Sequence, residues 1–137
     1  NARTPMQWDT SPNGGFTTGK PWLPVNPNYQ EINAADQVQR ADSVFNYYKK
    51  LIALRHASEL IKYGHYELLR PEDPELYIYR RYLDSQELLC VCNFSAKTRS
   101  YKLPEPFRQG TVLIKNLPDH DPSNGLLAPY EAYVIKK

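Results

Sequence analysis

The side chains best able to do chemistry in this sequence are a few carboxylates, and their spacing decides how they are interpreted. Glu72, Asp73 and Glu75 lie close together and alternate with Pro71 and Pro74. Paired carboxylates can act as general acid, general base or nucleophile. A cluster interrupted by two prolines, however, is typical of a turn. We therefore interpret these residues as a solvated hairpin and not as a catalytic pair.

The histidines and cysteines form no metal-binding pattern. His56, His65 and His120 lack the spacing of a zinc site, so we interpret them as surface or helix-end residues. Cys90 and Cys92 lie two apart in a predicted strand, on one face and roughly 7 Å apart. That separation disfavours a disulfide. The sequence therefore predicts reduced thiols, a cytoplasmic location, and neither a metal site nor a cofactor.

Charge and hydropathy exclude several classes of function. The chain has 137 residues, 41% of them hydrophobic, and a formal net charge of +2. Acidic and basic residues are interspersed, whereas nucleic acid selects a concentrated basic face. No apolar run approaches the ~18 residues of a membrane-spanning helix. We expect a chain with a hydrophobic core, no nucleic-acid partner and no membrane span.

Two stretches of different texture precede the C-terminal part. The region from Asn1 to about Asp42 is rich in proline and contains the turn signal Asn13–Gly15, with one short helix expected at 33–40. A loop of this length usually serves a site or packs on another part of a protein. A longer helix is predicted from about Ser43 to His56, because apolar residues recur there at helical spacing. Its apolar stripe is wide, so it should pack on a large neighbour.

The region from about Gly64 to Lys137 predicts an all-β domain. Short strands separated by turn residues such as Asp84-Ser85 favour a sandwich or small open barrel. Asn93–Ser95 is formally a glycosylation sequon, but its place at a strand end predicts that it is silent. The predicted strands are His65–Leu69, Leu76–Tyr82, Glu87–Phe94, Arg99–Leu103, Thr111–Lys115 and Glu131–Lys136.

Specific strings in the sequence resemble a known family. The run Asn1–Asp9, with its specific string Arg3–Trp8, is followed by Asn13–Thr17 and Pro21–Asn26. It closely resembles the loop after the seventh barrel strand of bacterial oligo-1,6-glucosidases and related α-glucosidases. Ser43–Arg55 is similar to the eighth barrel helix of these enzymes, and Leu88–Ser95 looks like a strand of their β-domain. They belong to the α-amylase superfamily, glycoside hydrolase family thirteen. The resemblance covers nearly the whole chain in the same order.

The resemblance implies a mainly β fold in two parts. Residues 1–60 would be the last loop and helix of a truncated (β/α)₈ TIM barrel, and residues 61–137 a C-terminal antiparallel β-sandwich domain. The family is retaining, with an Asp nucleophile, a Glu acid/base and a second Asp, all upstream of the string at 3–8. The resemblance thus implies an exo-acting α-glucosidase for short α-glucosides such as isomalto-oligosaccharides. It needs no cofactor, and this chain alone, with no catalytic residue, should be inactive.

The resemblance also implies substrate-binding candidates. Arg3 matches a family arginine that hydrogen-bonds the terminal glucose, although it could instead be a structural residue that ties the loop to the barrel. Its planar guanidinium suits sugar hydroxyls and a carboxylate. Trp8 and Phe16 could line the pocket mouth, because aromatic faces stack on sugar rings. They could equally pack the loop itself.

Partners and alternatives follow from the same resemblance. The expected partner of the chain is its own catalytic barrel, and without it the exposed helix face is expected to drive self-association. Trehalose-6-phosphate hydrolase, trehalose synthase and sucrose isomerase share much of the pattern. So does the non-catalytic amylase-like domain of amino-acid transporter heavy subunits. An independent carbohydrate-binding module is a further alternative, which would need an exposed aromatic platform.

Overall fold

The computed structural model describes residues 3–137, so the first two positions of the predicted loop lie outside the described residues. The chain divides into two units, Asn1–Lys50 and Leu51–Lys137. The expected boundary between a barrel tail at 1–60 and a β-domain at 61–137 stays a prediction. Within residues 3–137, no helix is both long and apolar enough to cross a membrane.

The first unit is loop-rich, as its proline content predicts. Before residue 43 its regular segments are short: the 3₁₀ helices η1 (Pro12–Gly15) and η2 (Pro27–Gln30) and the helix α1 (Ala34–Gln39). Asn33 is the N-cap of α1, since its Oδ1 accepts a hydrogen bond from Asp36 N at 2.9 Å. The short helix expected at 33–40 is therefore confirmed.

The longer helix is also present. Helix α2 runs over Val44–Ala57, and Ser43 caps it by accepting a hydrogen bond from Asn46 N at 3.2 Å. All the residues of α2 are at least partly exposed. A second helix, α3 (Glu59–Tyr63), follows at once and was not predicted; Ser58 caps it and Leu60 is buried in it.

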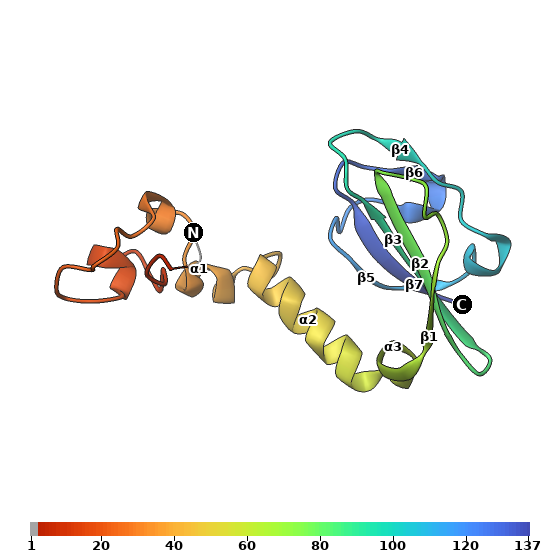
Figure 1. Cartoon of the computed structure of the whole chain (residues 1–137), viewed down its shortest axis with the longest axis horizontal. Coiled ribbons are helices and arrows are strands. Elements are labelled where there is room, and N and C mark those ends of the chain that lie inside the picture. Colours follow the sequence, from red (N-terminus) through yellow and green to blue (C-terminus); the bar gives the residue numbers. More distant parts are fainter. Residues whose placement is uncertain (1–2) are drawn as a thin grey trace. The chain divides into compact units, whose positions relative to one another are not determined.

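The second unit is built on one antiparallel sheet with the strand order β1-β2-β3-β7-β5. A smaller two-stranded sheet pairs β4 with β6 (Figure 1). The turn between β2 and β3 has two residues, with Asp84 at φ 51°, as suits a hairpin and as the sequence predicts. The strands are β1 His65–Leu68, β2 Leu76–Leu83, β3 Gln86–Asn93, β4 Arg99–Ser100, β5 Thr111–Lys115, β6 Leu126–Leu127 and β7 Ala132–Lys136.

The hydrophobic core lies on one face of the large sheet. Ile78, Leu89 and Val91 alternate along β2 and β3 and are fully buried. Leu127 of β6 and Phe107 of the 3₁₀ helix η3 (Glu105–Phe107) belong to the same cluster, so the smaller layer covers this face. The predicted fold class, a mainly antiparallel β-domain, is confirmed.

One predicted strand is wrong in length, and one strand was missed. The stretch Arg99–Leu103 pairs only at its first two residues, because Pro104 and η3 turn the chain away from the sheet. Its partner β6 is the two-residue run Leu126–Leu127, next to a 3₁₀ helix, η4 (Pro122–Asn124). A strand this short has too few residues to show an alternating pattern.

Candidate functional site

The loop that carries the predicted substrate-binding residues is organised by a sharp turn. Asn13, Gly14 and Gly15 all have positive φ, at 59°, 65° and 68°, a region that glycine and asparagine adopt most readily. The turn brings Trp8 back beside it, because Trp8 N donates to Gly14 O at 2.8 Å. The turn that the sequence predicts at Asn13–Gly15 is therefore present in this loop.

Asp9 is the centre of this turn. Its Oδ1 accepts hydrogen bonds from both Ser11 N, at 2.8 Å, and Ser11 Oγ. A Cβ on Gly15 would lie only 2.7 Å from the same oxygen, so the turn needs glycine there. The Ser11 hydroxyl, and then its backbone amide, hold the pKa of Asp9 below its ordinary value. Asp9 is therefore a carboxylate committed to the shape of the loop.

The loop is also tied to the segment that precedes α1. Gln7 Nε2 donates to Asn28 Oδ1 at 2.9 Å and to Ile32 O at 2.6 Å. The backbone carbonyls of Gln7 and Trp8 accept from the first amides of α1, both at 2.9 Å. These bonds satisfy donors that a helix start leaves open, and they fix the backbone of Trp8 within the unit.

The predicted site residues are placed differently from one another. Arg3 is exposed, and Trp8 and Phe16 are 53% and 47% exposed. Phe16 lines an open pocket of about 600 Å³ together with Asp9 and Asn13, whereas Arg3 and Trp8 are not among its lining residues. This pocket therefore does not bring the three candidates together, and their roles in substrate binding remain predictions.

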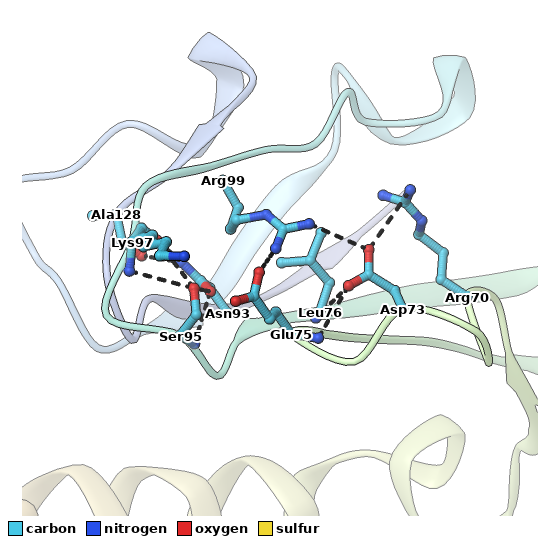
Figure 2. A network of polar contacts seen from close by, with 9 residues as sticks. All are labelled: Arg70, Asp73, Glu75, Leu76, Asn93, Ser95, Lys97, Arg99 and Ala128. Atoms are coloured by element: carbon cyan, nitrogen blue, oxygen red, sulfur yellow. Dashed lines mark hydrogen bonds and ion pairs between the residues drawn. The ribbon is translucent and has the colours of Figure 1, made fainter.

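The acidic cluster of the second unit lies in the turn between β1 and β2, as expected, and Glu72 is exposed there, but Asp73 is not solvated. The Asp73 side chain is only 8% exposed and lies between Arg70 and Arg99, at 3.7 and 3.8 Å (Figure 2). It also accepts two backbone hydrogen bonds, at 3.0 and 3.1 Å, and Glu75 pairs with Arg99. The two prolines lie in the turn, as predicted. The Asp73 carboxylate holds this turn to Arg99 of β4.

The sequon asparagine is fully engaged in a second polar network. Asn93 is 3% exposed, and its Nδ2 donates to Lys97 O at 2.8 Å and Ala128 O at 2.9 Å (Figure 2). Its Oδ1 accepts from both the amide and the hydroxyl of Ser95. A buried amide nitrogen with both donors used cannot accept a glycan in the folded chain, which agrees with the prediction of a silent sequon.

One buried carboxylate was missed. Glu131 is 0% exposed, and its Oε2 accepts from Ala128 N at 2.7 Å while Oε1 lies 2.8 Å from His120 Nδ1. His120 is thus not a plain surface histidine. Residues 3–137 contain no group of three or more metal-ligating side chains placed to hold an ion. These contacts, like those of Asp73 and Asn93, fasten loops to the sheet.

Comparisons with known families agree with this architecture. The family described as "Alpha amylase, catalytic domain" matches residues 1–64, and the one described as "Domain of unknown function (DUF3459)" matches residues 63–134. Matches in this order are those of a chain in which part of an alpha-amylase catalytic domain is followed by a β-domain. The chain belongs to the DUF3459 family, whose model matches more than half of it, and its N-terminal part is similar to the alpha-amylase catalytic domain.

Individual relatives are similar along almost the whole chain. An oligo-1,6-glucosidase of Parageobacillus thermoglucosidasius is 48% identical over 99% of the chain and 25% of the relative. A trehalose-6-phosphate hydrolase of Bacillus subtilis is 38% identical with the same coverages. The solved isomaltulose synthase from Klebsiella sp. has a TM-score of 0.92 and 42% identity, over 99% of this chain and 25% of that one. The chain thus spans about a quarter of the length of the relatives it matches.

Proposed function

We propose that the chain is part of a retaining exo-α-glucosidase that hydrolyses short α-glucosides such as isomalto-oligosaccharides. The observation that carries the proposal is the 48% identity to an oligo-1,6-glucosidase along 99% of the chain. In this proposal the catalytic carboxylates lie elsewhere in the protein, and the β-domain stabilises the barrel that holds them. The free thiols Cys90 and Cys92 support a cytoplasmic location.

Arg3 is proposed to bind the terminal glucose in the intact enzyme. It is exposed, and it precedes a loop whose backbone is anchored through Gln7, Trp8 and Asp9. A guanidinium on such a loop can donate several hydrogen bonds to sugar hydroxyls and to a neighbouring carboxylate. Trp8 and Phe16 present aromatic surface on the same loop and are proposed to border the pocket mouth.

The test is Arg3→Ala in the full-length enzyme. Loss of charge-assisted hydrogen bonds worth ~1.5–3 kcal/mol each should lower kcat/KM on isomaltose by ~100-fold, at ~1.4 kcal/mol per decade. Tm should fall much less. Arg3→Lys should rescue poorly, because one ammonium cannot replace a planar fork of donors.

A matched control is Lys20→Ala, which removes another exposed cation from the same unit and should leave kcat/KM unchanged. A lower Tm with unchanged activity per folded molecule in Arg3→Ala would instead make Arg3 a structural residue. That result would leave the α-glucosidase proposal standing, because turnover of isomaltose by the unaltered enzyme tests it separately.

The alternative activities are separated by substrate. The trehalose-6-phosphate hydrolase and isomaltulose synthase relatives are 38% and 42% identical to the chain, below the 48% of the oligo-1,6-glucosidase. Rates on isomaltose, trehalose 6-phosphate and sucrose would rank the three activities directly. The 137-residue chain alone should not turn over p-nitrophenyl α-glucoside. Turnover by the chain alone would contradict the proposal, and an intact protein inactive on all the substrates would favour the non-catalytic heavy-subunit alternative.

A further inference from the structure

The two thiols of the sheet face each other at close range. Cys90 and Cys92 lie on the face of β3 opposite to Leu89 and Val91, and both are free. Their sulfurs are 3.7 Å apart. Cys90 is 8% exposed and Cys92 is intermediate. Cys92 is therefore the more exposed residue of the pair.

The strand holds this separation in place. β3 is paired on both sides, with Cys90 opposite Tyr79 and Val134 and Cys92 opposite Tyr77 and Ala132. Closing the pair into a disulfide would require the sulfurs to approach to about 2.05 Å, which a strand fixed by two ladders resists. The geometry therefore favours a ligand that binds both sulfurs at their observed separation.

A metal ion fits the observed separation without movement. Two zinc–sulfur bonds of about 2.3 Å at a tetrahedral angle place their sulfurs about 3.8 Å apart. Thiolates select soft or borderline metal ions over hard ones. Tyr77 and Tyr79 border the pair and add no acidic oxygen that would favour calcium or magnesium.

We propose that Cys90 and Cys92 form a bidentate thiolate site for a soft divalent metal ion such as Cd²⁺ or Zn²⁺. On binding, each thiol loses its proton to solvent and each sulfur gives one electron pair to the ion, so two protons leave for each ion bound and no electron is transferred. Water fills the remaining positions on the ion. The site consists of residues of the second unit and does not rest on the proposed function.

The experiment is a Cd²⁺ titration of the reduced 137-residue chain, followed by ultraviolet thiolate-to-cadmium charge-transfer absorption and by proton release. We expect one ion per chain and two protons per ion. Cys92→Ala should weaken binding about tenfold or more, because a single thiolate loses the chelate. His65→Ala, which removes an exposed imidazole at the start of β1, should bind as the unaltered chain does.

Several results would overturn the proposal: no charge-transfer absorption, binding retained in Cys92→Ala, or one ion shared between two chains. Circular dichroism must show that each variant is folded. Cys90 is buried, so Cys90→Ala could unfold the chain. Cys92 is partly exposed, and its variant keeps the test decisive in that event.

Discussion

At the scale of single residues, Asp9 illustrates a carboxylate used for conformation. It accepts two hydrogen bonds from Ser11 and lies against Gly15, where a side chain would collide with it. Asp121 repeats the arrangement in the other unit, accepting from Ser123 N at 2.9 Å and Ser123 Oγ at 2.8 Å. In both cases hydrogen bonds lower the pKa of the aspartate.

The pH dependence of the first turn follows from this pair. We predict that Ser11→Ala raises the pKa of Asp9 toward its ordinary value of 3.8, because the hydroxyl is the largest cause of the shift. An aspartate whose folded pKa is lowered stabilises the turn above pH 3.8, and the effect is lost as pH falls through the folded pKa. Ser11→Ala should therefore lose this stabilisation at a higher pH than the unaltered chain does. An NMR titration of the Asp9 carboxyl group measures its pKa in the unaltered chain and in Ser11→Ala.

Ser123→Ala is the matched control for this prediction. It should leave Asp9 unchanged and move the pKa of Asp121 less, because there the backbone amide contributes more than the hydroxyl. An unaltered Asp9 titration in Ser11→Ala would show that the hydroxyl bond does not hold in solution.

At the scale of elements, the sequence predicts most strands but not how the loops are fastened to them. Alternating apolar residues and the Asp84-Ser85 turn were enough to place β2 and β3 within a residue or two. Asp73 was assigned to a solvated turn and Glu131 only to the start of a strand, and their burial depends on Arg99 and His120 from distant segments. In the candidate site, the Asn13–Gly15 turn was readable, but the role of Asp9 within it was not, since it depends on backbone φ values.

We expect the hydrogen bonds of the Asn93 side chain to contribute strongly to the stability of the β-domain. Asn93→Ala would leave the carbonyls of Lys97 and Ala128 without their donor in a buried place, at ~1–3 kcal/mol for each unsatisfied group. We predict a loss of ~2–4 kcal/mol in the free energy of unfolding, measured by urea denaturation of the chain.

Asn116→Ala is the comparison for this variant. Asn116 makes two similar bonds, to Tyr130 O and from Ala132 N, both 2.8 Å, but it is exposed, so water can replace them. Its loss should be ~0.5–1.5 kcal/mol. Equal losses of unfolding free energy in Asn93→Ala and Asn116→Ala would mean that burial does not determine the cost of removing these hydrogen bonds.

At the scale of the whole molecule, apolar residues are distributed unevenly. The buried hydrophobic cluster lies entirely in the second unit, between Leu76 and Ile135. Helix α2 instead exposes large apolar side chains, with Val44, Tyr48 and Ile52 at 77%, 64% and 48% exposure. Exposed apolar area of this kind is disfavoured in water by ~25 cal/mol per Å² and marks a surface for association.

We predict that the 137-residue chain self-associates through α2. Sedimentation should show species larger than a monomer at high concentration, and Tyr48→Lys combined with Ile52→Lys should shift the chain toward the monomer. Tyr63→Lys is the control, since Tyr63 is 69% exposed but lies outside α2. A chain that stays monomeric, or association unaffected by the double variant, would contradict the prediction.

The strand order has a consequence for biosynthesis. β7, the last strand of the sheet in chain order, lies between β3 and β5, which it joins through ladders on both sides (Figure 1). Until residues 132–136 have left the ribosome, β3 has an open edge and β5 has no partner in the sheet. Open edges invite pairing with other chains, and contacts between distant segments form slowly. The β-domain is therefore expected to fold only after its synthesis is nearly complete, which makes the nascent chain a natural client for chaperones.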